Sequence, residues 1–421
     1  MHIILLAGGV SRRMQPLPNK NTLNIAGKDL LDYNIHEIQN LANVESINII
    51  FQESQRAYFE NRFGADQKIN LFPQAAANGM AGAILSLQNL PNALVISAND
   101  MLEPQFLAQL IATIQDQKPK AAILGKQVDS YFPGGYLSVD ANNHLTDIVE
   151  KPPVGQEPSD LVNLVYHYFE DLGAFQKILK NLGPLEDDSY EQALKALSKQ
   201  IPVQVIPYKG QWQAVKKPWN LLDMQKHLIA KGYVKSQSNV QIHPTAIVED
   251  SVTFGDNVVI DAYAIIKGQT FIGDNTYVGS YSMIRDSHIG ANCLVGSRCE
   301  ITRSYLGDDN KLHANFVGDS YIGNHCLLGY GVTTANYRLD GKTIDGQPKL
   351  GAILGNNVQI GCHTVLSPGV KIGANSVLGP NTVLKQDLSA NFYMPPKSVI
   401  LDYLRLSIAD HQTYYQLYLL T

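Results

Sequence analysis

The chain of 421 residues has neither long hydrophobic runs nor a strong excess of charge. Nowhere do about 18 apolar residues follow one another, so we expect no membrane-spanning helix. The start, MHIILLAGG, lacks the basic segment of a secretion signal, and we expect a cytoplasmic protein. A formal net charge of -5 offers no basic field for a nucleic-acid backbone, so nucleic acid is not an expected partner.

Cysteine is also scarce, and all of it lies in the second half of the chain. No CxxC pair occurs, which argues against a zinc site and against a dithiol redox pair. In a reducing compartment the thiols stay free. We interpret all of them as packing residues: Cys293, Cys299, Cys326 and Cys362.

What the second half does have is a repeat. A large aliphatic residue or phenylalanine recurs at steps of six residues, with some steps of five, first from Ile242 to Leu328 and again from Leu354 to Leu384. This period fits neither a helix nor an alternating strand and predicts stacked coils. Each short strand would bury one aliphatic side chain, turn at a small residue and stack on the coil below.

This repeat resembles the hexapeptide-repeat family, whose fold is a left-handed parallel β-helix with three hexads per coil. The handedness comes from the resemblance alone, because the period does not determine it. The resemblance also implies a homotrimer that binds acetyl-CoA and its acceptor between neighbouring subunits.

The repeat breaks at residues 329–353, and a loop of that length inserted into a tight coil is usually functional or disordered. The string KLHANFVGD before it, with TANY and KLGA after it, is similar to the acetyltransferase half of the bifunctional enzymes that make UDP-N-acetylhexosamines, above all their archaeal relatives. The resemblance makes His313 the general base for a sugar amine that attacks acetyl-CoA, a task suited to imidazole. It assigns the acceptor and CoA site to Phe316 (where the family usually has tyrosine), Asn336, Tyr337 and Lys349.

The first half begins with a short apolar run, Ile3 to Ala7, as expected for a strand buried on both faces. Gly8 and Gly9 follow directly and would let backbone N–H groups approach phosphates. The string LAGGVSRRMQPLPNK, followed by LNIAGKDLLDY, resembles the signature of the sugar-1-phosphate nucleotidylyltransferases, which implies an α/β Rossmann-like domain.

By this resemblance Arg13 and Lys20 hold the triphosphate and stabilise charge on the α-phosphorus during attack by the sugar phosphate. The implied nucleotide-binding residues are Leu6, Ala7, Gly8, Gly9, Gln74, which reads a pyrimidine edge, and Gly79. The implied sugar-binding residues are Gly135, Glu150 and Asn163.

A magnesium site is expected at Asp100. Residues 92–100 predict a buried strand that ends in this acid, and ligands bind at the carboxyl ends of strands in such sheets. Family members generally have a second Asp or Asn where this chain has Ala214, and Lys216 and Lys217 add positive charge nearby.

We therefore predict a nucleotidylyltransferase domain at residues 1–218, a linker helix at 219–239, a left-handed β-helix at 240–397 and a capping helix at 398–421. The leading hypothesis is an enzyme that joins an NTP (UTP or dTTP) to a hexose or N-acetylhexosamine 1-phosphate with Mg²⁺, releases pyrophosphate, and acetylates an amino-sugar 1-phosphate from acetyl-CoA. One alternative keeps only nucleotidyl transfer, with the β-helix for oligomerisation or regulation. Another is a noncatalytic sugar-nucleotide sensor or assembly subunit, which Met80, Asn99 and Ala214 favour.

Overall fold

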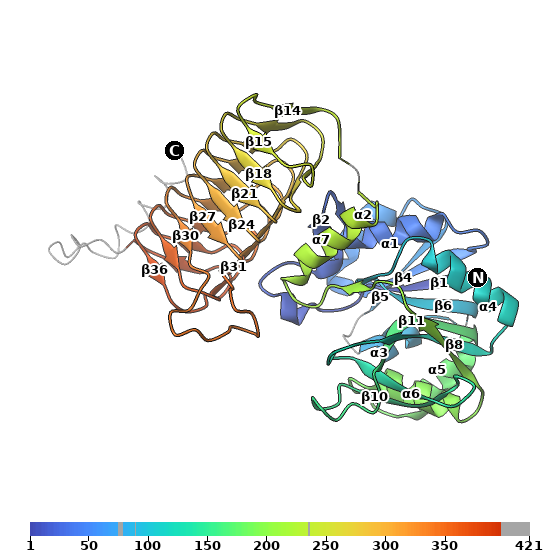
Figure 1. The fold of residues 1–421 in the computed structure, drawn as a ribbon. Coiled ribbons are helices and arrows are strands. Elements are labelled where there is room, and N and C mark those ends of the chain that lie inside the picture. Colours follow the sequence, from blue (N-terminus) through green and yellow to red (C-terminus); the bar gives the residue numbers. More distant parts are fainter. Residues whose placement is uncertain (75–78, 89, 235, 397–421) are drawn as a thin grey trace.

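A computed structural model describes residues 1–74, 79–88, 90–234 and 236–396. The chain folds into an α/β half and a β-helix that stand side by side, with the connecting helix between them (Figure 1). The predicted capping helix at 398–421 lies outside the described residues.

The α/β half is built on one mixed sheet. Its strands run in the order β10-β9-β11-β6-β1-β4-β5, with β8 beside β11 and β12 beside β8. Their bounds are β1 His2–Leu6, β4 Ser46–Gln52, β5 Ile69–Gln74, β6 Pro91–Ser97, β8 Ala121–Gln127, β9 Gly135–Val139, β10 Leu145–Glu150, β11 Leu161–Asp171 and β12 Val203–Tyr208. Two small ribbons pair β2 Asn24–Ile25 with β3 Lys28–Asp29, and β7 Asp100–Met101 with β13 Gln213–Ala214.

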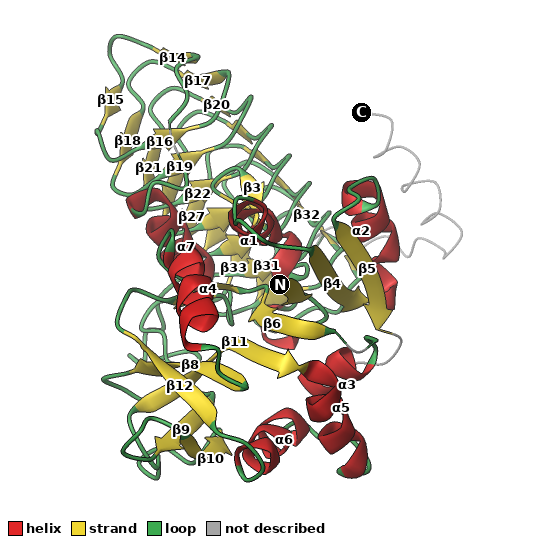
Figure 2. Cartoon of the chain, turned by 90° about the vertical axis from the view of Figure 1, so that its right-hand side faces the viewer, coloured by secondary structure: helices red, strands yellow, loops and turns green. Residues whose placement is uncertain are grey.

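Helices cover both faces of this sheet (Figure 2). The helices that pack on one face are α1 Leu30–Gln39, α2 Arg56–Phe63 and α4 Phe106–Gln117. Those on the other face are α3 Gly79–Leu85, α5 Leu172–Asn181 and α6 Ser189–Ser198. The apolar run at the start of the chain is confirmed as central strand β1: Ile3 and Leu5 pack on one face and Ile4 on the other.

The second half is a left-handed parallel β-helix with three sheets, in which every strand pair is parallel. One sheet holds β14 Val240–Ile242, β17 Val258–Ile260, β20 Tyr277–Val278, β23 Leu294–Val295, β26 Lys311–Leu312, β29 Leu327–Leu328, β32 Gln359–Ile360, β35 Val377–Leu378 and β37 Tyr393–Met394. The second holds β15 Ile247–Val248, β18 Ile265–Lys267, β21 Met283–Arg285, β24 Glu300–Thr302, β27 Phe316–Gly318, β30 Thr333–Thr334, β33 Val365–Leu366 and β36 Val383–Leu384. The third holds β16 Thr253–Phe254, β19 Phe271–Ile272, β22 His288–Ile289, β25 Tyr305–Leu306, β28 Tyr321–Ile322, β31 Ile353–Leu354 and β34 Lys371–Ile372.

The repeated aliphatic residues form the core of this prism. From Phe254 to Leu384 they are buried in one cluster, as the repeat predicts. Ile242, in the first coil, is instead 44% exposed, because no coil covers it from below. Cys293, Cys299 and Cys326 point into the core as expected, but Cys362 is exposed, so its interpretation as a packing residue was wrong.

The interruption of the repeat is shorter than the sequence indicates. The coil continues through β30, and Thr334 fills the slot of the missing aliphatic residue. Its buried hydroxyl group accepts a hydrogen bond from Ser320 Oγ at 2.8 Å, which satisfies a polar group inside the prism. The inserted loop therefore spans residues 335–352 rather than 329–353.

The two halves share a buried interface. Strand β25 of the third sheet contributes Tyr305, whose hydroxyl group donates to Asn24 O at 2.8 Å. The ring of His288 stacks on Tyr305 at 4.6 Å, and its Nε2 accepts from the N–H of Ala26 at 3.1 Å. An apolar cluster surrounds these bonds. The α/β half, the β-helix and helix α7 Asn220–Ala230 all contribute side chains to it. Its buried members are Met14, Leu17, Leu23, Ile25, Leu30, Tyr33, Met101, Val215, Leu221, Leu222, Met224, Leu228, Tyr305, Tyr321, Leu350 and Ile353.

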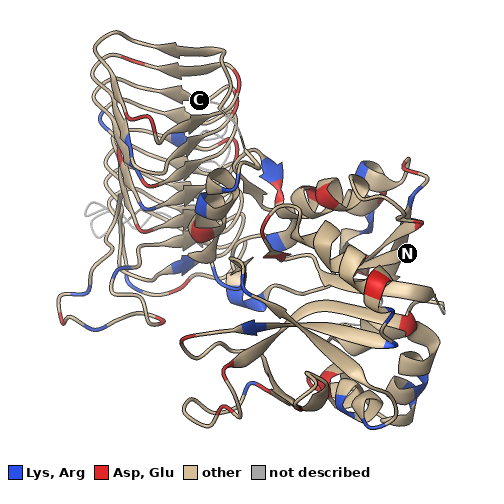
Figure 3. Ribbon diagram, turned by 45° about the vertical axis from the view of Figure 1, so that its right-hand side comes forward, with Lys and Arg blue, Asp and Glu red and all other residues tan. Residues whose placement is uncertain are grey.

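Charged residues of both signs are interspersed over the two halves (Figure 3). Within the described parts of the chain, no helix combines the length and apolar character that a bilayer crossing requires.

Candidate active sites

The loop after β1 has its backbone carbonyl groups occupied by hydrogen bonds from other parts of the domain. Side-chain amides of three residues bind these carbonyls: Asn21 donates to Ala7 O at 3.0 Å, Gln52 to Gly8 O, and Asn19 to Gly9 O at 2.8 Å. In the described residues the N–H groups of Gly8 and Gly9 have no protein partner. A loop whose carbonyls are occupied and whose N–H groups are free is suited to an anion such as phosphate.

The predicted base-reading residues adjoin this loop. Gln74 ends β5, and its Nε2 donates to Gly79 O at 3.3 Å at the start of α3. A Cβ on Gly8 would lie 2.8 Å from Gln74 Oε1, so glycine is required for this close approach. Gly79 has a positive φ of 63°. The structure thus brings Gly8, Gln74 and Gly79 together at the carboxyl ends of β1 and β5.

Three charged side chains meet beside the loop. Lys20 lies in the short helix Lys20–Thr22, Asp100 is 5% exposed at the start of β7, and Lys216 follows β13. Burial lowers the pKa of Lys20 to about 8, although Asp100 opposes the shift. Burial likewise lowers the pKa of Lys216 to about 8, again opposed by Asp100. Arg13, exposed in the preceding helical turn, disfavours the charge of both lysines and so belongs to the same electrostatic group.

The carboxyl group of Asp100 is tightly surrounded. Burial raises its pKa, whereas Lys216 and Lys20 pull it down. Asn99 Nδ2 donates to its Oδ1 at 3.0 Å. Asp100 also does not end the strand predicted for residues 92–100: β6 stops at Ser97, and Asp100 begins the separate ribbon with β13.

The residues around Asp100 do not fit a magnesium ion held by two protein carboxylates. The residue opposite Asp100 in the ribbon is Ala214, which has no donor atom. No group of three or more His, Cys, Asp or Glu side chains that could hold a metal ion occurs among the described residues. The charges that act on Asp100 are those of Lys216 and Lys20, so a magnesium ion at this site stays a prediction.

The predicted sugar-binding residues lie on adjoining strands. Gly135 and Glu150 are partners in the β9–β10 ladder, and a Cβ on Gly135 would lie 3.2 Å from Glu150 Oε2. Glu150 also raises the pKa of Lys216, which links this ladder to the charged group beside the loop. Lys151 Nζ lies 3.0 Å from Glu150 Oε1 and 2.9 Å from Asp187 Oδ2.

Asn163 on β11 is held by a buried histidine. His167 lies 2.9 Å from Asn163 Oδ1 through Nε2 and 2.9 Å from the hydroxyl group of Tyr190 through Nδ1. Because an amide oxygen only accepts, Nε2 carries the proton and Nδ1 accepts from Tyr190. Burial lowers the pKa of His167 to about 3, so it stays neutral and fixes the orientation of the Asn163 amide.

The predicted acetyltransferase residues are only partly assembled within one chain. Phe316 and Asn336 meet at Gly318, where an added Cβ would lie 2.9 Å from the Phe316 ring and 2.7 Å from Asn336 Nδ2. His313 is exposed at the corner before β27, where its N–H donates to Asn315 Oδ1 at 2.6 Å. Asn336 instead contacts Asp319 at the corner after β27.

The inserted loop is anchored at the same later corner. Asn336 Nδ2 donates to Asp319 Oδ2 at 2.5 Å, and Arg303 donates to both oxygens of that carboxylate, at 2.6 and 2.7 Å. Leu350 N donates to Asn336 O at 2.9 Å, which places Lys349 next to this anchor. Lys349 is exposed, and Tyr337 is 51% exposed, so both are available to a ligand or a neighbouring subunit.

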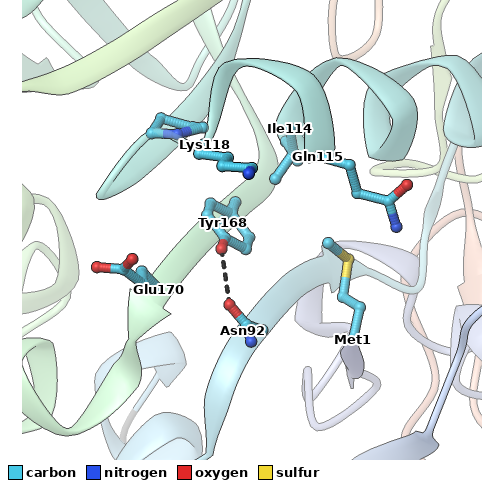
Figure 4. Close-up of a pocket in the computed structure, with 8 residues that line it drawn as sticks. Met1, Asn92, Ile114, Gln115, Lys118, Tyr168 and Glu170 are labelled. Carbon is cyan, nitrogen blue, oxygen red and sulfur yellow. Dashed lines mark hydrogen bonds between the residues drawn. The ribbon is translucent and has the colours of Figure 1, made fainter.

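A cavity of about 320 Å³ lies at the opposite ends of the strands, next to the amino ends of β1 and β6 (Figure 4). Its lining includes Met1, Asn92, Tyr168 and Glu170, and the Tyr168 hydroxyl group donates to Asn92 Oδ1 at 2.9 Å. Ligands of open α/β sheets bind at the carboxyl ends of strands. This cavity is therefore not part of the candidate site.

Sequence reasoning missed some residues of the site. Asn19 and Asn21 lie within the recognised string and are polar residues next to Lys20, which is a usable signal. Gln52 and His167 come from distant strands and carry no local signal. The sequence indicates Lys216 only as nearby charge, because the register of β13 on β7 cannot be deduced from it.

Comparison with known proteins covers nearly the whole chain. The nucleotidyl transfer family model, described as "Nucleotidyl transferase", matches residues 2–231. The model "GMPPB C-terminal domain" matches residues 230–364, and "Bacterial transferase hexapeptide (six repeats)" matches residues 351–386.

Curated relatives are similar from end to end. The "Bifunctional protein GlmU" of Methanococcus maripaludis (strain C7) is 30% identical and covers 95% of this chain and 98% of its own length. The protein of the same name from Methanococcus aeolicus is 29% identical, with 95% and 98% covered. The "Bifunctional sugar-1-phosphate nucleotidylyltransferase/acetyltransferase" of Sulfurisphaera tokodaii is 28% identical, with 92% and 98% covered. Among solved structures, UDP-glucose pyrophosphorylase complexed with UDP-glucose is 19% identical with a TM-score of 0.48, and covers 55% of this chain and 98% of its own.

Proposed function

Because this chain belongs to the nucleotidyl transferase family and, over 95% of its length, to the bifunctional GlmU-type proteins, we propose that it performs two successive transferase reactions on an amino sugar. The β-helix would transfer an acetyl group from acetyl-CoA to an amino-sugar 1-phosphate. The α/β half would join UTP or dTTP to a hexose or N-acetylhexosamine 1-phosphate and release pyrophosphate.

The observation that carries nucleotidyl transfer is the loop after β1. Among the described residues its N–H groups at Gly8 and Gly9 have no protein partner, and Asn19, which precedes Lys20, donates to Gly9 O at 2.8 Å. Arg13 acts electrostatically on Lys20. In the proposed reaction a phosphate oxygen of the sugar 1-phosphate attacks the α-phosphorus of the NTP, and pyrophosphate leaves. The cations stabilise the charge that accumulates on the phosphate oxygens, which is the main contribution of a protein to such transfers.

Acetyl transfer is supported by the placement of the inserted loop. Its ends are fixed at Asp319, and it leaves His313, Tyr337 and Lys349 accessible. In the proposed step the nitrogen of the sugar amine attacks the thioester carbonyl while His313 accepts a proton from that amine. CoA then leaves as the thiol. We further propose a homotrimer in the cytoplasm, in which a neighbouring subunit completes this site.

The proposed division of the chain follows these roles. Residues 1–218 carry nucleotidyl transfer, 219–239 connect the two halves and 240–397 carry acyl transfer, whereas the predicted capping segment at 398–421 lies outside the described residues.

Nucleotidyl transfer is tested by pyrophosphate release from UTP, dTTP, GTP and CTP with a panel of sugar 1-phosphates. Wild type is expected to turn over with UTP or dTTP, and Lys20→Met is expected to lose about 100-fold or more in rate, as when one stabilising donor is removed. Lys68→Met, on an exposed lysine outside the site, serves as the matched control. Tight binding of a nucleotide sugar without pyrophosphate release would favour the sensor alternative, which the alanine opposite Asp100 supports.

Acetyl transfer is tested separately by thiol release from acetyl-CoA with glucosamine 1-phosphate and galactosamine 1-phosphate. His313→Ala is expected to reduce thiol release about 100-fold or more and to leave pyrophosphate release unchanged. His325→Ala, at an exposed β-helix corner, is the control. If wild type releases no thiol, the β-helix serves oligomerisation or regulation only.

A further inference from the structure

The ribbon β7–β13 places residue 214 directly opposite Asp100. Ala214 and Asp100 are partners in this antiparallel pair, as are Gln213 and Met101. Opposed side chains of such a pair lie on the same face, with Cβ atoms about 5 Å apart. A carboxylate at position 214 would therefore share a cation with Asp100, whereas the methyl group of Ala214 offers no ligand.

Lys216 brings a positive charge to the same face. The N–H of Val215 donates to Asn99 O at 3.0 Å, so the backbone continues beside β7 past the ribbon. In an extended chain, residues 214 and 216 point to the same side. The charge of Lys216 accordingly interacts with Asp100 and Lys20, as well as with Glu150 and Arg13.

The Lys216 side chain is fixed by its surroundings. Its Nζ lies 3.7 Å from the centroid of the Phe132 ring and donates to Pro133 O at 3.4 Å. Its backbone N–H donates to Asn220 Oδ1 at 3.2 Å, which ties the residue to the start of α7. A lysine held in this way presents a preorganised cation, so little further ordering is needed when an anion binds.

This cation is not neutralised by a direct ion pair. Among the ion pairs of the described residues, none joins Lys20 or Lys216 to Asp100, and Glu150 is already paired with Lys151 at 3.0 Å. The charge of Lys20 also lowers the pKa of Lys216. An anion bound between two partly desolvated like charges stabilises both of them and reduces their mutual repulsion.

We propose that Lys216 binds the NTP phosphates directly and supplies the positive charge that a divalent cation shared by Asp100 and a carboxylate at position 214 would supply. This proposal rests on nucleotidyl transfer as the function of the α/β half. It makes Lys216 a substrate-binding residue of that site, and it makes nucleotide binding largely independent of a protein-held metal ion.

The first test measures binding to the full-length chain by calorimetry, with UTP, dTTP and inorganic triphosphate, each with Mg²⁺ and with EDTA. Wild-type affinity is expected to change less than about threefold on metal removal, because the cations are built into the chain. Lys216→Met is expected to weaken binding about tenfold or more in EDTA, the effect of losing one charge-assisted contact. Lys216→Arg is expected to restore most of it. Lys217→Met is the matched control, since Lys217 lies over the Trp219 ring at 4.9 Å.

The second test is a gain of metal binding, which a merely structural role of Lys216 would not produce. The double variant Ala214→Asp with Lys216→Gly is expected to immobilise Mn²⁺ in the absence of any phosphate ligand, seen by electron paramagnetic resonance. Wild type is expected to immobilise none. Wild type that immobilises Mn²⁺, or Lys216→Met that binds UTP as wild type does while retaining its melting temperature, would overturn the proposal. Wild type that binds none of the three probes would overturn nucleotidyl transfer as well.

Discussion

At the residue scale, one buried histidine couples the two halves of the molecule. His288 is fully buried between the rings of Phe271 and Tyr305, at 5.4 and 4.6 Å. Its Nδ1 lies 3.0 Å from Leu306 O, which only accepts, so Nδ1 carries the proton and Nε2 accepts from Ala26 N–H. Burial lowers the pKa of His288 from 6.5 to about 4. A proton on Nε2 would break the bond between the halves.

This histidine predicts a loss of stability in acid. The unfolded chain binds a proton below pH 6.5, whereas the folded chain resists it until about pH 4, so the free energy of unfolding falls as pH drops through that window. One such group contributes about 1.4 kcal/mol per pH unit, or about 2 kcal/mol at pH 5. Urea unfolding between about pH 7.5 and 5 should show a smaller pH dependence for His288→Gln than for wild type.

The control for that measurement is His325→Gln, on an exposed histidine of the same β-helix, whose pH dependence is compared with that of His288→Gln. An equal pH dependence in His288→Gln and wild type would contradict a neutral, buried His288. His167, whose pKa is lowered to about 3, contributes in the same direction, so part of the pH dependence remains in the variant.

At the element scale, the coils are held at their corners by buried amides as well as by the aliphatic core. Asn310 is fully buried, and its Nδ2 donates to Gly307 O at 2.7 Å and to Gly323 O at 2.9 Å. Its Oδ1 accepts from Cys326 N at 2.8 Å. One side chain therefore satisfies backbone groups of successive coils. The repeat of aliphatic residues does not reveal such a residue, because the repeat describes only the apolar side of each coil.

Replacement of this amide should open the prism locally. Asn310→Ala leaves Gly323 O and Cys326 N without these partners, and Gly307 O keeps only the weak donor Cys293 Sγ at 3.3 Å. Each buried group left unpaired costs about 1–3 kcal/mol, so we expect a loss of more than about 2 kcal/mol in the free energy of unfolding. Asn292→Gly is the comparison: Asn292 has a positive φ of 54° that glycine adopts freely, and its side chain accepts only from exposed Asn275. Chemical denaturation followed by circular dichroism measures both, and equal losses would contradict the structural role of Asn310.

At the scale of the whole molecule, the segment from Gly8 to Lys20 packs against the β-helix. This segment follows β1, is proposed to bind the nucleotide, and is called the nucleotide loop below. Met14 and Leu17 follow Arg13 closely and are buried in the same cluster as Tyr321 and Ile353 of the prism. Leu350, at the end of the inserted loop, belongs to that cluster too. The segment that carries the proposed phosphate-binding residues thus depends on the second half of the chain for its packing.

This arrangement predicts that a β-helix residue controls nucleotide affinity. Tyr305→Ala removes the hydrogen bond to Asn24 O and leaves a cavity, at a cost of about 3–5 kcal/mol. Because the nucleotide loop packs on this cluster, we expect UTP to bind at least about tenfold more weakly, measured by calorimetry at a temperature where the variant is folded. Tyr281→Ala, on an exposed tyrosine stacked on Tyr263 at 5.0 Å, is the control. Unchanged affinity in Tyr305→Ala would show that the loop keeps its shape without the prism.

The local pattern of residues by itself determined much of this protein. The step of six residues predicts the core of the prism from Phe254 to Leu384, because each short strand buries one side chain at a fixed place in the hexad. The apolar run and glycine pair predict β1 and its anion-binding loop for the same reason, since a strand and the turn after it are contiguous. The family resemblance adds Gln74, Gly135 and Glu150, of which the structure sets Gln74 against Gly8 and pairs Gly135 with Glu150.

Only the tertiary structure decided what depends on contacts between distant segments. The register that sets Ala214 opposite Asp100 and Lys216 beside it, the support of Asn163 by His167, and the packing of the nucleotide loop on the prism all join residues far apart in the chain. The true length of the insertion also depends on a tertiary contact. A threonine fills an aliphatic slot only where a neighbouring coil supplies a hydrogen-bond partner. A period in the sequence describes the residues of one chain segment. The register between strands, the interactions between charged side chains and the partners of buried polar groups arise only when distant segments pack together.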